Sequence, residues 1–501
     1  MIFGFSNFIF FSCYYKIIAE NLLFLHNYFY EFNIIMMFRL FHKFKKEFPK
    51  VVILLFLIFV SNTLLLSQKP KTVENDQYIE NPIITSEDSL HSIRALQKDI
   101  TELLNDKNLN NTKFGVVVYS LDTKKYIYRK NPDEYLTPGS NSKLYTALGA
   151  LMSLGKNFQV RTSVYIDGEV SNNILNGDIY IYGRGDALLS TSDIEYLADK
   201  VRNFGIKEIN GNVIADGTFF DEETERVRYS NDRDVVQSTP PITALSLEQN
   251  VVQIIVNSGS QSGRPVGVQT IPASEAFTIS NQAKVVGGNA RPERKSKGSN
   301  GNFYKLNDNF TSQFPNYELS NNGDSKDLIS FQSSRRREGI SVSNKVLNSG
   351  FQQFVITGNL EANQTSYHSY FISKPNLVVA GALKNRMASG GVVVKGNISE
   401  GSLKISKTGN PKFIAEFSRP LLDIAILMNK KSDNYLAETM FKLIGANSGK
   451  MKDNAKEAQQ VIFNCMDSLN VFCEKCAFND GSGLSRRNLT SATCLVQDRQ
   501  S

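Results

Sequence analysis

The sequence predicts an α+β protein with helical segments near both ends and a long β-rich segment between them. Apolar residues recur at helical spacing in residues 88–105, 138–151, 421–428 and 435–444. Short β-rich runs alternate with Gly/Asn/Ser-rich turns in residues 161–395. The chain has 501 residues, 41% hydrophobic and 21% charged, which is typical of a globular protein of two or three domains.

The N-terminal part of the sequence has the pattern of an exported protein. Residues 51–66, VVILLFLIFVSNTLLL, follow a basic stretch and have the length of a signal-peptide core. We therefore expect an export signal in residues 37–67 and a periplasmic or cell-envelope location. An uncleaved N-terminal membrane anchor is the open alternative, because no A-x-A pattern follows. Residues 1–36 lack a folded-domain pattern and are expected to be a non-native or leader extension.

Composition argues against nucleic-acid binding and against a metal site. The net charge is a modest +7, and the basic runs at 291–297 and 335–337 lie in Gly/Ser/Asn-rich surroundings typical of exposed loops. Cys473 and Cys476 form a C-x-x-C, for which an exported chain favours a disulfide or two free thiols over zinc, since no second ligand pair accompanies them. The four histidines are scattered, so we expect no metal and no cofactor.

The stretch PGSNSKLYTALGAL at residues 138–151 places Ser140 three residues before Lys143 at the expected start of a helix. Residues three apart on a helix are neighbours, so the lysine amine is expected beside the serine hydroxyl. A serine is a poor nucleophile until an adjacent base takes its proton, and a lysine serves as that base when burial or nearby cations lower its pKa. The sequence therefore predicts a serine–lysine pair suited to acyl transfer.

A second motif, Ser432-Asp433-Asn434, follows far along the chain. S-x-x-K followed by S-D-N is the ordered motif pair of the active-site serine penicillin-recognising enzymes. The chain resembles the D-alanyl-D-alanine carboxypeptidases and endopeptidases of the class C, type 4 penicillin-binding proteins, peptidase family S13. The resemblance rests on PGSNSKLYTALGAL, YGRGDALLS at 182–190, PPITALSLEQN at 240–250, MNKKSDNYLAETMFK at 428–442 and NDGSGLSR at 479–486.

The resemblance implies a penicillin-recognising, transpeptidase-like domain, an antiparallel sheet flanked by helices, that is interrupted by a large β-rich insert. We accordingly expect one part of the catalytic domain in residues 88–160, the insert in 161–395 and a second, incomplete part in 396–501. Strands are expected at 114–121, 125–130, 161–167, 177–183, 210–217, 251–256 and 351–360.

Two local patterns complete the expected helices. Ser192 and Glu195 match a capping box, with Gly205 closing the helix that follows. Glu438 and Lys442 are spaced to form an i,i+4 ion pair.

By resemblance, Ser140 is the acylating nucleophile, Lys143 its general base, Ser432 a proton relay, and Asn434 a hydrogen-bonding partner of substrate and Lys143. Taken alone, the S-D-N tripeptide also fits an ordinary helix N-cap. The DGSGLSR run is expected to shape tight turns, with its role left open. The implied partners are peptidoglycan peptides and β-lactams, which would acylate Ser140.

The third motif of the family, Lys-Thr/Ser-Gly on a strand, is expected beyond Arg486, yet the sequence stops at Ser501. Lys407-Thr408-Gly409 precedes Ser432 and is expected to be a hairpin turn instead. A missing motif strand would remove an oxyanion-hole donor, whose loss costs about 10²- to 10³-fold in rate. The predicted function is a C-terminally truncated D,D-carboxypeptidase or endopeptidase. The alternatives are a catalytically impaired relative that only binds muropeptide and, less favoured, a β-lactamase.

Overall fold

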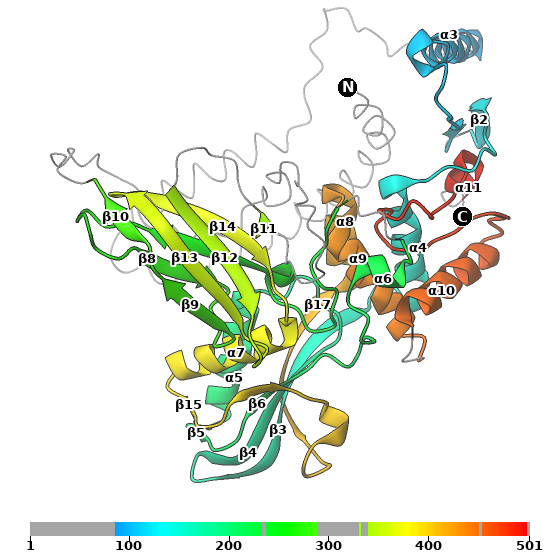
Figure 1. Ribbon diagram of the computed structural model, residues 1–501. Helices are drawn as coiled ribbons and strands as arrows, with labels where there is room; N and C mark the ends of the chain where they lie inside the picture. Colours follow the sequence, from blue (N-terminus) through cyan, green and yellow to red (C-terminus); the bar gives the residue numbers. More distant parts are fainter. Residues whose placement is uncertain are drawn as a thin grey trace, which may run out of the picture. The chain divides into compact units, whose positions relative to one another are not determined.

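A computed structural model of the chain is shown in Figure 1. Residues 1–91 and 92–501 form separate units. No helix in the described part of the chain is both long and apolar enough to cross a membrane. The expected leader (1–36), the export signal (37–67) and the basic runs at 291–297 and 335–337 lie outside the described residues. Those are 86–121, 123–232, 237–287, 330–331, 339–449 and 453–497.

The segment before Ser140 forms the helix and the hairpin that the sequence predicted. Helix α3 (Ser86–Leu104) and the short η1 (Lys107–Leu109) lead into β1 (Val116–Ser120) and β2 (Lys125–Lys130), which pair antiparallel. The Gln97 side-chain amide donates to the Ile127 carbonyl oxygen at 2.7 Å, which ties the helix to the second strand.

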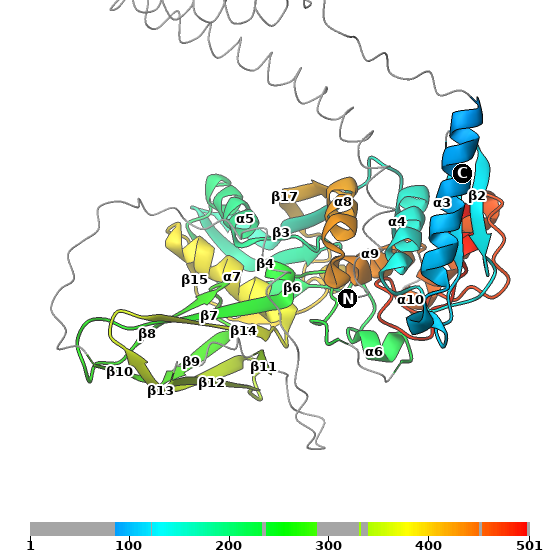
Figure 2. The same ribbon diagram turned by 90° about the horizontal axis from the view of Figure 1, so that it is seen from above.

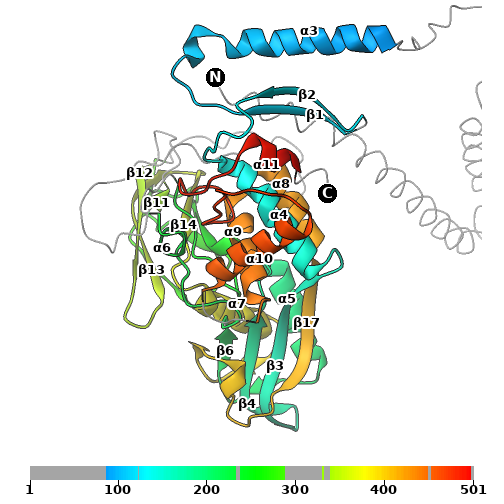
Figure 3. The ribbon, with the colours of Figure 1, turned by 90° about the vertical axis from the view of Figure 1, so that its right-hand side faces the viewer.

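A helical core holds the predicted nucleophile segment. Helix α4 packs against α8, α9 and α10, as Figure 3 shows, and Tyr145, Phe441 and Ile462 are among the side chains fully buried there. The helical spacing of Cys465 from Ala458 and Ile462 predicts a core position, and Cys465 is buried on α10. The elements are η2 (Gly139–Asn141), α4 (Ser142–Leu154), α8 (Leu421–Lys431), α9 (Asn434–Ala446), α10 (Asn454–Ser468) and α11 (Ala492–Gln497).

The buried face of α4 agrees only in part with the sequence pattern. Helical spacing predicts that Leu144, Ala147, Leu148 and Leu151 face the core; Ala147 is buried, but the three leucines are only half-buried. The face that is buried carries polar groups, among them Lys143 and Thr146, because they bond to a loop from the C-terminal part of the chain. A pattern based on apolar residues alone points away from such a face.

The largest sheet has seven strands, in which β3 pairs antiparallel with β4 and β17, while β4 pairs parallel with β6. Helices α5 (Thr191–Asn203) and α7 (Pro375–Ser389) pack together against this sheet (Figure 1). The strands are β3 (Gln159–Ser171), β4 (Ile174–Gly183), β5 (Glu208–Ile209), β6 (Val213–Asp216), β15 (Val393–Val394), β16 (Ile398–Glu400) and β17 (Lys412–Pro420).

Two four-stranded sheets make up the rest of the β-rich segment, and they are grouped at one side of Figure 2. One contains β9 (Phe277–Asn281), β10 (Lys284–Val286), β12 (Gly339–Val346) and β13 (Gln352–Glu361); the other contains β7 (Val251–Asn257), β8 (Gly267–Ile271), β11 (Ser330–Phe331) and β14 (Thr365–Phe371). The remaining short elements are α6 (Arg226–Tyr229), η3 (Glu248–Asn250) and η4 (Leu403–Ile405).

The α+β class and each expected strand are confirmed, with two corrections among the helices. Helix α7 was not predicted, because it is apolar around most of its circumference and so shows no amphipathic period. The capping box of α5 is formed by Ser190 and Asp193 rather than by Ser192 and Glu195. The proposed domain boundaries at residues 160 and 396 stay a prediction.

Candidate active site

Ser140 and Lys143 are brought together as their spacing predicted. Ser140 lies in the single turn of η2 directly before α4 and is exposed, whereas Lys143 is 2% exposed. The Lys143 ammonium nitrogen lies 3.3 Å from the Ser140 Oγ. An exposed hydroxyl beside a buried amine is the arrangement that nucleophilic catalysis by serine needs.

Two further acceptors hold the Lys143 amine in place. Its Nζ donates to the Asn434 Oδ1 at 2.7 Å and to the Ser482 carbonyl oxygen at 2.9 Å. Burial lowers the pKa of Lys143 to about 8, although the nearby carboxylates of Glu438, Asp433 and Asp480 oppose that shift. A substantial fraction of this lysine is therefore neutral near pH 8 and able to accept a proton.

Asn434 reaches Lys143 because helix α9 begins there. Asp433 caps the helix, its Oδ1 accepting the Leu436 amide at 3.0 Å, which confirms the N-cap interpretation of S-D-N. The catalytic role of the motif stays a prediction. The side-chain nitrogen of Asn434 donates to the Gln237 Oε1 at 2.8 Å. Its amide is thus fixed from both sides, with its oxygen turned toward Lys143.

Within the described residues, Ser432 makes no hydrogen bond to the Ser140–Lys143 pair. It ends α8 in the left-handed conformation, with φ 52° and ψ 39°, and its side chain is exposed. The relay role of Ser432 stays a prediction.

The DGSGLSR loop, residues 480–486, packs directly beneath the nucleophile turn. A Cβ on Gly483, which has φ +86°, would lie 1.7 Å from the Gly139 carbonyl oxygen, so only glycine fits this approach. The Thr146 hydroxyl on α4 donates to the Gly481 carbonyl at 2.8 Å. The loop therefore positions both the Ser140 turn and, through the carbonyl of Ser482, the Lys143 amine.

Glu438 is a residue of this site that the sequence interpretation misassigned. Its fully buried carboxylate accepts the Ser482 amide at 2.9 Å and the Tyr229 hydroxyl at 2.8 Å. Burial raises the pKa of Glu438 to about 7, and the Asp480 carboxylate adds to the rise. Its spacing of four residues from Asn434 on the same helix face was the available signal.

The expected Glu438–Lys442 ion pair does not form among these contacts. Lys442 instead pairs with Asp221 at 2.5 Å, and it too is fully buried. On a helix buried on all sides, each charged side chain pairs with a different surrounding loop, so the i,i+4 rule for exposed helices does not apply.

The 240–250 motif also meets α9. Asn250 is fully buried, and its side-chain amide donates to the Tyr435 hydroxyl at 3.0 Å and the Thr243 hydroxyl at 3.1 Å. Tyr435 directly follows Asn434, so this contact supports the start of α9. The motif contributed to the family resemblance, but no structural role was predicted for it.

Arg226 and Asp480 form an ion pair that supports the 480–486 loop. Their charged groups lie 2.9 Å apart, with side chains 1% and 0% exposed. Asp480 also accepts the backbone amides of Gly483 at 2.9 Å and Ser485 at 2.7 Å. Arg226→Ala is expected to lower the free energy of unfolding by about 3–5 kcal/mol, because it leaves a buried carboxylate without its counter-charge.

The matched control for this change is Arg228→Ala on the same short helix. Arg228 pairs with Glu225 at 2.8 Å, but both side chains are more than half exposed, so the loss should stay below about 1 kcal/mol. Urea unfolding followed by circular dichroism measures both. Equal losses of unfolding free energy in the two variants would show that the buried ion pair stabilises the protein no more than the exposed pair does.

Lys407-Thr408-Gly409 forms a turn, as expected, but not the turn of a hairpin. The backbone amides of Lys407 and Thr408 donate to the Asp167 carboxylate at 2.6 and 3.1 Å, and Gly409 has φ +69°. The segment before it is the short helix η4 rather than a strand. Lys407 pairs with the buried Asp178 at 2.7 Å, which raises the pKa of Lys407.

Cys473 and Cys476 are joined in a disulfide, one of the two states that the C-x-x-C left open. Their sulfur atoms and that of Cys494 lie within 4.8 Å of one another, and no other cluster of potential metal-ligand side chains is found in the described part of the chain. Two of these sulfurs are bonded to each other, so they are not thiolate ligands in this state. The absence of a metal stays a prediction.

Known proteins of one family match this chain over most of its length. The profile described as D-Ala-D-Ala carboxypeptidase 3 (S13) family matches residues 96–352 and 323–499. The chain belongs to this family. Membership confirms the resemblance, and the S13 peptidases are serine enzymes, in agreement with the exposed Ser140 hydroxyl beside Lys143.

Two curated relatives of the S13 chain are D-alanyl-D-alanine carboxypeptidases. The protein of Actinomadura sp. (strain R39) is 25% identical over 414 residues, covering 81% of this chain and 67% of its own. D-alanyl-D-alanine carboxypeptidase DacB of Haemophilus influenzae is 21% identical over 399 residues, covering 78% of this chain and 71% of its own.

A solved structure shows the same fold. The crystal structure of penicillin binding protein 4 from Haemophilus influenzae matches 77% of this S13 chain and 74% of its own, with a TM-score of 0.52 and 18% identity. The same protein complexed with a novel β-lactam matches 80% of this chain and 76% of its own, also with a TM-score of 0.52.

Proposed function

We propose that this chain is a serine-type D-alanyl-D-alanine carboxypeptidase, with endopeptidase action on cross-linked stem peptides, that works through an acyl-enzyme at Ser140. The observation that carries the proposal is the Lys143 amine, which is buried and lies 3.3 Å from the Ser140 Oγ and 2.7 Å from the Asn434 Oδ1. Membership in the S13 family supports the substrate class.

In the acylation step, neutral Lys143 accepts the Ser140 proton while the Oγ attacks the carbonyl carbon of the penultimate D-alanine. The peptide C–N bond then breaks, and the departing amine takes the proton that Lys143 accepted, so that D-alanine or a cross-linked peptide leaves and Lys143 is neutral again. Water hydrolyses the ester and restores the Ser140 hydroxyl. Asn434 orients Lys143 throughout, and Ser432 is the proposed relay toward the leaving amine.

The same serine would open a β-lactam ring, forming a comparable ester. A serine hydrolase of peptidoglycan acts outside the cytoplasmic membrane, so the proposed location is the periplasm or cell envelope, reached through the export signal in residues 37–67 or held there by an N-terminal anchor. A carboxypeptidase should hold the penicilloyl ester for far longer than a β-lactamase would.

The proposed function is tested with two short peptides that end in D-Ala-D-Ala or D-Ala-L-Ala. The full chain is expected to release D-alanine from the first and to leave the second uncleaved. A folded chain that releases no D-alanine yet binds the first peptide would favour the muropeptide-binding alternative. Rapid turnover of benzylpenicillin would favour the β-lactamase.

The acylation rate should depend on pH through Lys143. Only the neutral amine accepts the serine proton, and its pKa lies at about 8. The rate of covalent labelling by a β-lactam should therefore rise about tenfold per pH unit below pH 8 and level off above it. Stopped labelling reactions between pH 5 and pH 10 measure this profile, and a flat rate from pH 6 to 9 would argue against Lys143 as the base.

A further inference from the structure

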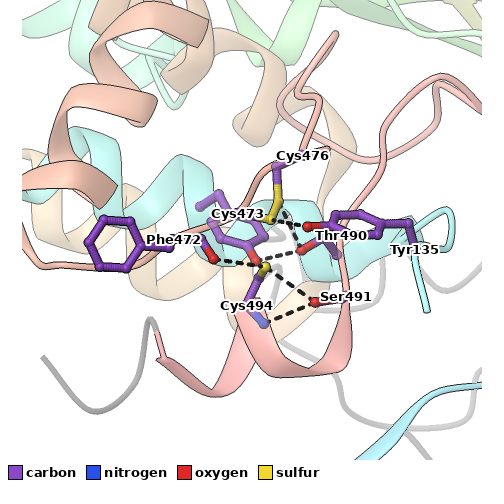
Figure 4. The surroundings of a disulfide bond; sticks show 8 residues. Tyr135, Phe472, Cys473, Cys476, Thr490, Ser491 and Cys494 are labelled. Carbon is purple, nitrogen blue, oxygen red and sulfur yellow. Dashed lines mark hydrogen bonds between the residues drawn. A yellow bond between two sulfur atoms is a disulfide. The ribbon is translucent and has the colours of Figure 1, made fainter. Parts of the chain in front are cut away.

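Three cysteines gather on the side of the helical core that contacts the segment before Ser140. Cys473 and Cys476 are disulfide-bonded and half-buried, whereas Cys494 on α11 is a free thiol and 2% exposed. All three sulfur atoms lie within 4.8 Å of one another. Figure 4 shows the three cysteines side by side. A free thiol this close to a disulfide is placed to react with it.

We propose that Cys473, Cys476 and Cys494 form an intramolecular thiol–disulfide exchange site. The Cys494 thiolate attacks one sulfur of the Cys473–Cys476 bond, a new bond to Cys494 forms, and the other sulfur leaves as a thiolate that takes up the proton. The number of disulfides and thiols is unchanged, so no outside oxidant or reductant is required. The exchange converts the disulfide within the C-x-x-C into a disulfide between the C-x-x-C and Cys494 on α11, and back.

Polar groups around the cluster suit a departing thiolate. The Thr490 hydroxyl lies 3.5 Å from the Cys476 sulfur, and the Tyr135 hydroxyl lies 3.9 Å from the Cys473 sulfur (Figure 4). Either hydroxyl is within reach to donate a hydrogen bond to the sulfur that leaves. Whichever of the two sulfurs leaves as a thiolate, a hydroxyl group therefore lies beside it.

The attacking thiol is also held in place. The Ser491 hydroxyl oxygen lies 3.2 Å from the Cys494 sulfur and accepts the Cys494 backbone amide at 3.2 Å. The carbonyl oxygen of Phe472, the residue before Cys473, lies 3.7 Å from the same sulfur. These contacts keep the Cys494 sulfur beside the residues that carry the disulfide.

The exchange would move a disulfide cross-link in the region that contacts the segment before Ser140. Thr490 bonds through its backbone to Leu136, at 2.9 and 3.0 Å, and its hydroxyl lies 2.7 Å from the Tyr145 hydroxyl on α4. Leu136 is four residues before Ser140. A bond from Cys494 to the 473–476 loop would cross-link α11 to that loop beside these contacts.

The exchange is tested by mapping the cysteines of the full chain purified without reductant. The chain is incubated at pH 8.5, quenched with acid and N-ethylmaleimide, digested, and analysed by mass spectrometry. We expect Cys494 in two forms, alkylated and disulfide-linked to Cys473 or Cys476. Cys465, also a buried free thiol, should remain unlinked and serves as the internal control. A single disulfide, Cys473–Cys476, with Cys494 never linked would overturn the proposal.

Single variants test the same geometry independently. Cys473→Ser or Cys476→Ser, treated with oxidised glutathione, should form a disulfide between Cys494 and the remaining cysteine, whereas Cys465→Ser should leave the native pattern unchanged. If both variants are folded by circular dichroism and neither links Cys494, the proposal fails. Neither measurement depends on peptidase activity.

Discussion

Replacement of Ser140 by alanine is expected to abolish D-alanine release while leaving the fold intact. The exposed hydroxyl makes one hydrogen bond among the described contacts, at 3.3 Å to Lys143, so its loss removes the nucleophile and little packing. Without it no acyl-enzyme forms, and only the residual catalysis of binding and polarisation remains. The measurement is D-alanine release by the purified variant, with circular dichroism as the check on folding.

Ser142→Ala is the matched control for that experiment. Ser142 is two residues away and 1% exposed, and its hydroxyl oxygen accepts a hydrogen bond from the Asn488 side chain at 3.3 Å. Its removal should cost about 1 kcal/mol of stability and leave the chemistry in place. Equal loss of activity in the two variants, or retained activity in Ser140→Ala, would contradict the assignment of Ser140.

Lys143→Met is expected to reduce the rate of acylation by about 10²- to 10⁴-fold, the range for removing a general base. Methionine fills a similar volume but accepts no proton, and it leaves Asn434 Oδ1 and the Ser482 carbonyl without the donor they now share. The second-order rate of labelling by a fluorescent penicillin measures the effect, and it should fall at every pH.

Lys442→Met controls for the loss of a buried lysine as such. Burial lowers the pKa of Lys442 as it does that of Lys143, but Lys442 pairs with Asp221 and has no contact with Ser140. This variant should lose stability yet retain the acylation rate of its folded fraction. If both variants lost acylation alike, the role of Lys143 would be structural support rather than proton transfer.

Much of the fold follows from local patterns that need no knowledge of packing. Alternating and β-branched runs identified the hairpin β1–β2 and the long strands β3, β4, β7 and β13, and helical spacing identified α3, α4, α8 and α9. Helix α7 was not predicted, because a helix that is buried on all sides shows no alternation of apolar and polar residues that would separate a core face from a solvent face.

The site also contains residues that local patterns predict and residues that only the tertiary fold brings together. The pair Ser140 and Lys143 was predicted because three residues along a helix fix their separation, and Asn434 came from the resemblance to the motif order of the family. Glu438 was misassigned, since its partners in the 480–486 loop are distant in sequence and only the fold brings them to α9. Buried polar networks of this kind are set by tertiary contacts, which spacing within one helix does not encode.

The central claim, that Ser140 is the acylated residue, is tested most directly by locating a β-lactam adduct in the unmodified chain. The protein is incubated with benzylpenicillin at pH 8, quenched and digested, and the penicilloyl group is mapped by mass spectrometry. We predict a single adduct, on the peptide that contains Ser140 and at that residue. An adduct at another serine, or none on a chain that circular dichroism shows to be folded, would contradict the account.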